Sequence, residues 1–104
     1  MKIGKLYQFK EYGWYMYPSK EIANIAGTTT VLWYAGLGDS SRLRVRLRRL
    51  SSLFNCEVIC VGPRSMFVLL GYEANHWNIL TADGQFGWIS FFDWCMEHVE
   101  EVNQ

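Results

Sequence analysis

Chemically reactive side chains are sparse in this sequence, and only one group of them suggests catalysis. Asp93, Cys95 and His98 lie close together near the C-terminus. A histidine beside a cysteine can activate the thiol as a nucleophile, and a third group can orient the histidine. A buried, unreactive Cys95 beside a solvated His98 explains the same residues, and we favour that interpretation. We therefore expect no enzymatic activity and no catalytic residue.

Metal and phosphate sites are weakly indicated. Cys56 and Cys60 would share one side of a strand, but no second cysteine pair completes a zinc site. The segment Gly36-Leu37-Gly38 lacks the further glycine and the helix signal of a phosphate-binding loop. Three cysteines without a Cys-x-x-Cys motif are typical of reduced thiols rather than of a disulfide framework. We expect no metal, no cofactor and a cytoplasmic location.

The most concentrated charge in the chain is a run of five arginines: Arg42, Arg44, Arg46, Arg48 and Arg49. Leu43, Val45 and Leu47 alternate with them, which is typical of a strand. A second apolar pattern fits one face of a helix: Leu43, Leu47, Leu50 and Phe54. We favour extended structure because Val45 falls outside the helical pattern and no acidic residue supports a first helical turn.

These arginines suggest a nucleic-acid ligand. On a strand, alternate arginines would lie about 6.6 Å apart on one face, close to the phosphate repeat of a nucleic acid. Arginine also binds phosphate through two donors. Binding of single-stranded nucleic acid through Arg42 to Arg49 is therefore our second hypothesis. The arginines could instead pair with acidic residues of the same chain, because the net charge is zero and acidic residues cluster near the C-terminus: Asp93, Glu97, Glu100 and Glu101.

The strongest structural signal is a predicted hairpin between residues 77 and 89. Apolar and aromatic residues alternate on both sides of Asp83-Gly84. Asp-Gly between two such segments is typical of a two-residue hairpin turn, in which both central residues need positive φ. We therefore predict two antiparallel strands joined by a tight turn at these two residues.

Further short strands are predicted where β-branched and aromatic residues cluster: residues 5–10, 12–17, 28–34, 56–61, 66–72 and 97–102. The segment 36–41 has the composition of a turn, and 90–94 suits a short 3₁₀ turn before the last strand. Residues 20–27 fit a loop or one helical turn, with Ser19 or Asn24 as local caps.

The predicted fold is all-β, a small barrel or sandwich of five to seven short antiparallel strands. At 104 residues the chain is long enough for one core, so residues 1–104 form a single domain. No run approaches 18 apolar residues and no apolar segment follows the N-terminus, so we expect neither a membrane span nor a signal peptide.

The segment from about Leu53 to Trp94 resembles SH3-like barrels, especially bacterial SH3 domains. The resemblance is carried by Trp77 at the start of a strand and by Gly84-Gln85-Phe86-Gly87-Trp88-Ile89 before the 3₁₀ turn. The segment Trp14-Tyr15-Met16-Tyr17-Pro18-Ser19-Lys20 resembles small stand-alone SH3-like proteins of tailed phages, in particular cyanophages. That second resemblance implies a phage accessory or structural protein.

The resemblance also implies a binding site. In peptide-binding members the tryptophan at this position lines a groove, a role that would fall on Trp77, with Tyr15 and Tyr17 from the first long loop. Ser90 stands where the family's groove has a proline, so we do not expect specificity for proline-rich ligands.

Our leading hypothesis is a non-enzymatic module that binds a protein or peptide through exposed aromatic rings. Tyrosine and tryptophan are enriched at protein interfaces because they combine a large rigid area with a polar tip. A homo-oligomer or a virion component would use the same surface. Six rings exceed what one face of each strand can bury, which favours exposure: Tyr12, Trp14, Tyr15, Tyr17, Trp33 and Tyr34. The alternative is that these rings form the barrel core and a second small core under the long loop.

Overall fold

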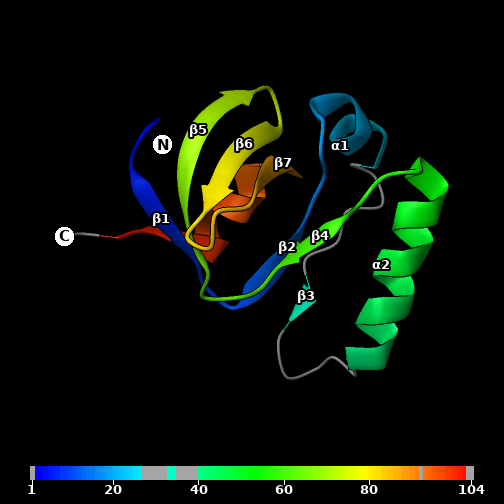
Figure 1. Ribbon diagram of the computed structural model, residues 1–104. Coiled ribbons are helices and arrows are strands. Elements are labelled where there is room, and N and C mark those ends of the chain that lie inside the picture. The colour runs from blue at the N-terminus through cyan, green and yellow to red at the C-terminus, as the bar shows by residue number, and fades with distance from the viewer. Residues whose placement is uncertain (1, 27–32, 35–39, 92, 103–104) are drawn as a thin grey trace.

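The computed structural model describes residues 2–26, 33–34, 40–91 and 93–102. Over these residues the chain forms short strands, two α-helices and one 3₁₀ helix (Figure 1). In chain order these are β1 (Leu6–Phe9), β2 (Tyr12–Met16), α1 (Lys20–Ala26), β3 (Trp33–Tyr34), α2 (Ser40–Phe54), β4 (Ile59–Val61), β5 (Met66–Glu73), β6 (His76–Thr81), β7 (Phe86–Ser90), η1 (Asp93–His98) and β8 (Val99–Glu101).

Five strands form an antiparallel sheet in the order β7-β6-β5-β1-β8. The meander β5–β6–β7 uses short connections, whereas β1 is placed between β5 and the last strand. A smaller antiparallel sheet has the order β3-β2-β4. The expectation of a mostly β fold with a 3₁₀ turn before the last strand is confirmed.

The predicted hairpin forms, but its turn is one residue longer than we expected. The Thr81 and Gln85 backbones pair across three residues, and the Gly84 N–H donates to the Thr81 carbonyl at 3.0 Å. Gly84 has a φ of 90°, while Asp83 is not among the residues with positive φ. A turn followed by a left-handed glycine is a common three-residue hairpin loop. The prediction of a two-residue turn is therefore wrong, although Asp83-Gly84 lies at the turn.

The two sheets meet where the end of β2 crosses β7. Tyr17 and Trp88 exchange two backbone hydrogen bonds, of 2.8 and 2.7 Å. The crossing is close because Gly87 has no side chain: a Cβ there would lie 2.7 Å from both the Met16 Cγ and the Tyr17 carbonyl oxygen. Over the described residues the sheets meet along this edge without closing into a barrel.

The arginine-rich segment is a helix, and our preference for extended structure over Arg42 to Leu50 is wrong. Leu47, Leu50 and Phe54 pack against the side chains around Tyr17, so the helical apolar pattern finds a surface to bury. Val45 lies outside that pattern and is 53% exposed. The helix therefore forms with Val45 in solvent, and Leu53 near its C-terminal end is also exposed.

The other expected elements are found with shifted limits. Residues 20–27 were expected to form a loop or one helical turn, and α1 extends over most of them. Ser19, one of the two expected caps, does cap its start, because the Ile22 N–H donates to the Ser19 hydroxyl at 3.2 Å. Of the strand expected at 28–34, β3 is described and 28–32 lie outside the described residues, as does most of the turn expected at 36–41.

The buried side chains form two clusters. The first, here called the sheet core, is rich in stacked rings: Tyr7, Phe9, Trp14, Met16, Val61, Phe67, Leu69, Trp77, Ile79, Ile89, Phe91 and Val99. The second, the helix core, lies under α1 and α2: Tyr15, Tyr17, Ala23, Leu50 and Val58. Strand β2 separates them and is buried on both faces, because its alternate residues belong to different clusters.

Candidate functional site

The aromatic residues proposed as a binding surface are buried. Tyr15 and Tyr17 are 2% and 1% exposed and lie in the helix core. Trp77 is 7% exposed and stacks on Phe91 in the sheet core, with ring centroids 3.6 Å apart. The prediction that these three rings present one exposed surface is therefore wrong. Strand β2 is covered on both faces, so its aromatic side chains are buried in two different cores: Trp14 in the sheet core and Tyr15 in the helix core.

Ser90 shows how the region near Trp77 is covered. Its hydroxyl donates to the Ala23 carbonyl of α1 at 3.1 Å, and both residues are buried. Helix α1 is therefore attached to β7 by a buried hydrogen bond at Ser90.

The cysteine and histidine residues do not assemble a reactive group in the described structure. His98 is half-buried and packs edge-on against the Tyr12 ring, with centroids 4.7 Å apart. Its Nε2 lies 3.4 Å from an oxygen of the exposed Glu97 carboxylate. The side chains of Asp93 and Cys95 lie outside the described residues, so the possible Cys95–His98 pair, which we did not favour, is untested.

The two described cysteines give no sign of activation. Burial raises the pKa of the Cys56 thiol, which favours the protonated form over the nucleophilic thiolate. Cys60 lies at the edge of an open pocket. Within the part of the chain that the structure describes, no three His, Cys, Asp or Glu side chains are grouped to hold a metal ion.

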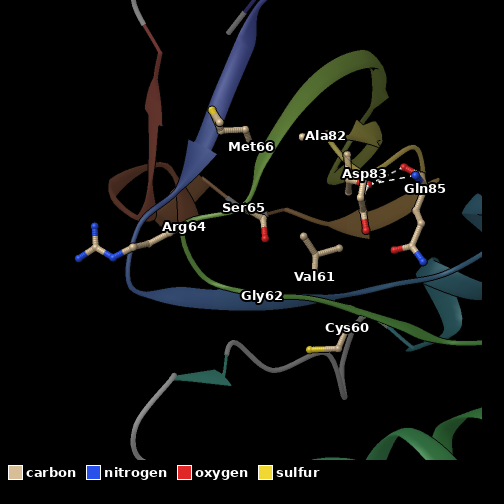
Figure 2. A pocket seen from close by; sticks show the side chains of 10 residues that line it. Cys60, Val61, Gly62, Arg64, Ser65, Met66, Ala82, Asp83 and Gln85 are labelled. Carbon is tan, nitrogen blue, oxygen red and sulfur yellow. Dashed lines mark hydrogen bonds between the residues drawn. The ribbon is translucent and has the colours of Figure 1, made fainter.

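This open pocket, of about 380 Å³, lies between β4, β5 and the β6–β7 turn (Figure 2). Its polar groups mainly stabilise the turn. The Thr81 hydroxyl donates to the Asp83 carboxylate and accepts from the Gln85 N–H at 3.1 Å. The Arg64 side chain points away from the hollow, as Figure 2 shows. Thr81, Asp83 and Gln85 hydrogen-bond to one another. Among the described residues that line the pocket, no pair of groups is therefore placed for acid–base chemistry.

The basic helix α2 is the most strongly charged element of the structure. It contains five arginines and no acidic residue. Because the net charge of the chain is zero, the remainder carries five more negative than positive charges. Arg48 and Arg49 are exposed, and over the described residues neither forms an ion pair. Internal pairing, which the sequence left open, is therefore not seen for these two residues.

The arginine helix and the acidic C-terminal strand lie at opposite sides of the molecule (Figure 1). Glu100 and Glu101 belong to β8, whose free edge faces away from α2. The charge separation follows from the topology, because β8 pairs with β1 in the five-stranded sheet while α2 packs in the helix core, on the other face of β2. An anion approaching α2 therefore meets little repulsion from this acidic strand.

A second exposed feature is an apolar row on the outer face of the five-stranded sheet. Leu6 pairs with Val68, Val68 with Leu80, and Leu80 with Phe86, so these residues cross four strands side by side. Phe86 is 65% exposed, and the neighbouring Leu70 is also exposed. Our sequence reasoning missed this row. The alternation of side chains along a strand could have revealed it. Leu80 and Phe86 are an odd number of positions from the buried Ile79 and Ile89, so they face the other side of the sheet.

Comparisons with protein-family models, with curated proteins and with solved structures find no match to this chain. Within the described residues, none of the helices has the length and hydropathy needed to cross a membrane.

Proposed function

We propose that this chain is a non-enzymatic binding protein whose ligand is a nucleic acid, held by the arginines of α2. The observation that supports this proposal most is the single sign of charge on an exposed helix, with Arg48 and Arg49 free of ion pairs in the described structure. Nucleic-acid binding through this segment, specified there as binding of a single strand, was the second hypothesis from the sequence. It now ranks first because Tyr15, Tyr17 and Trp77 are buried.

The chemistry of the helix fits phosphate better than a carboxylate surface. Guanidinium groups bind phosphate oxygens through paired donors and keep their charge at any physiological pH. Neutralising phosphates also releases condensed counterions, so a small number of arginines supplies useful affinity at moderate salt. The apolar side of α2 anchors the helix through Leu47, Leu50 and Phe54, which leaves the other side open for a ligand.

The test is a titration of fluorescent nucleic acid with the full chain at several salt concentrations. The double variant Arg48→Gln, Arg49→Gln should weaken binding at least several-fold and make its salt dependence shallower. On duplex DNA the logarithmic slope should change by about 0.9 for each phosphate that the variant no longer neutralises. Arg64→Gln is the matched control, because Arg64 is an exposed arginine outside α2. No binding at low salt, or equal weakening in the control, would contradict the proposal.

The second candidate is a protein- or peptide-interaction module, now placed on the outer sheet face rather than on Trp77. The apolar row ending at the exposed Phe86 favours it, since aromatic residues surrounded by apolar neighbours anchor protein interfaces. A homo-oligomer or a subunit of a virion would use such a face. Sedimentation of the wild type and of Phe86→Ser tests self-association. A wild-type dimer that dissociates in the variant supports this candidate. If both proteins sediment as monomers, the homo-oligomer is excluded.

The finer fold assignment belongs with this proposal. We infer that the five-stranded sheet is an SH3-like domain with a long insertion, residues 10–65, between β1 and β5. Its support is the order of elements, in which the meander β5–β7 is followed by η1 and by β8 beside β1. The phage origin implied by the resemblance and a location in the host cytoplasm or a virion are compatible with both candidates.

A further inference from the structure

The helical conformation changes which nucleic acid the arginines can fit. On a strand, alternate arginines share one face, whereas on a helix residues two apart lie about 200° apart around the axis. The expected ladder along a single strand is therefore absent. The arginine positions of α2 divide into two rows instead: positions 44 and 48 form one, and positions 42, 46 and 49 form the other.

The two rows lie on opposite flanks of the open side of the helix. At about 100° per residue their centres are roughly 150° apart, and the buried line of Leu47, Leu50 and Phe54 lies on the other side of the helix. Val45 lies between the rows and is exposed. The open side of α2 therefore has an apolar residue at its centre and a row of arginine positions on each flank.

The C-terminal half of α2 is attached to the rest of the structure. Leu50 is buried in the helix core, and the Ser51 hydroxyl accepts from the Val58 N–H at 3.2 Å. The helix ends at Phe54, and the next residue, Asn55, has a φ of 50° and a backbone N–H that donates to the Ser52 carbonyl. Such a left-handed residue is a common helix terminator. These interactions fix the C-terminal half of α2.

Two flanking rows of positive charge match a groove with phosphates on both walls. The major groove of B-form DNA is about 12 Å wide and admits an α-helix with its side chains. A single strand offers one line of phosphates and would contact one row. The major groove of duplex RNA is deep and too narrow for such a helix. We infer that α2 binds in the major groove of double-stranded DNA, with one arginine row toward each phosphate wall and Val45 toward the base edges.

This inference rests on the proposed function and adds the form of the ligand. No amide or carboxylate side chain lies within α2, so the helix lacks the groups that read adenine and cytosine edges. Arginine can still contact guanine. The binding should therefore be dominated by phosphate contacts and show weak sequence preference.

The experiment compares three fluorescent ligands of equal length, a DNA duplex, one of its strands and the corresponding RNA duplex, each about two helical turns long. Anisotropy titrations should give the tightest binding to the DNA duplex. Two matched variants test the rows: Arg44→Gln with Arg48→Gln, and Arg46→Gln with Arg49→Gln. Each removes two charges from one row, and glutamine keeps a high helix propensity. Circular dichroism establishes that each variant is folded.

The two-row arrangement predicts similar reductions of duplex affinity, at least several-fold, for both variants. Binding of the single strand or the RNA duplex as tightly as the DNA duplex would overturn the inference while leaving the proposed function in place. So would a reduction confined to one row. If none of the three ligands binds at low salt, the proposed function itself fails, and binding of polyglutamate would then indicate an acidic protein partner.

Discussion

The sheet core and the helix core are built from adjacent residues of β2 but are stabilised in different ways. In the sheet core, Phe9 stacks on Trp14 and on Phe67 with centroids 4.6 and 4.5 Å apart, between strands that are also joined by ladder hydrogen bonds. In the helix core, α2 is attached mainly by side-chain packing around Tyr17. The difference suggests that the sheet core supports the whole fold, while the helix core positions the charged helix.

The largest effect is expected in the sheet core. Phe67→Ala should lower the free energy of unfolding by about 3 to 5 kcal/mol, because the ring is fully buried between Phe9 and Tyr7. Phe86→Ala on the same sheet is the control and should stay within about 0.5 kcal/mol, since its ring is exposed. Urea denaturation measures both. Equal destabilisation would show that the sheet core does not dominate stability.

The next effect should be specific to the helix core. Leu50→Ala should cost about 2 to 4 kcal/mol, whereas Leu53→Ala in the same helix should have little effect because Leu53 is 70% exposed. If the helix detaches first in Leu50→Ala, its helical circular dichroism signal should be lost at a lower urea concentration than the one at which tryptophan fluorescence changes. Coincident transitions would contradict this separation and show that the two cores unfold as one cooperative unit.

The crossing between the two regions gives the third prediction. Gly87→Ala should cost about 1 to 3 kcal/mol, because its Cβ would meet the Met16 side chain and the Tyr17 carbonyl oxygen. Gly71→Ala is the matched control in the same sheet, since a Cβ there meets no atom within 4 Å. Thermal unfolding of both variants checks this. A neutral Gly87→Ala would mean that β2 and β7 separate easily.

The smallest effect concerns the ion pair between α1 and β5. The Lys20 ammonium donates to the Glu73 carboxylate at 2.7 Å, and this hydrogen bond raises the pKa of Lys20 above its ordinary value. The stabilisation is therefore present below the ordinary lysine pKa and is lost as pH rises through the raised value of the folded state. Both side chains are partly or largely exposed, so the contribution is small.

Unfolding midpoints at neutral and strongly alkaline pH test this pair. Lys20→Gln should be slightly less stable than wild type at neutral pH, and the difference should disappear at alkaline pH. Lys10→Gln, another exposed lysine, should show no such convergence. A difference for Lys20→Gln that persists at alkaline pH would show that packing rather than charge is responsible.

The candidate site was only partly predictable. The arginine cluster was evident from the sequence, but its arrangement was not, because Leu43, Val45 and Leu47 fit a strand while Leu43, Leu47 and Leu50 fit a helix. The aromatic residues were also evident. Their burial depends on α1 and α2 covering the second face of β2, which no local pattern reveals.

The sequence by itself determined the meander and the position of its turn, though not the length of the turn, because Asp83, Gly84 and the alternation around them act through local backbone geometry. It likewise determined the strong positive charge of residues 42–49. The tertiary structure alone decided that this segment is a helix and that Tyr15 and Tyr17 are interior. The physical reason is that an ambiguous apolar pattern adopts the conformation that buries it, and the surface that buries Leu50 is assembled from α1, β2 and residues near Val58.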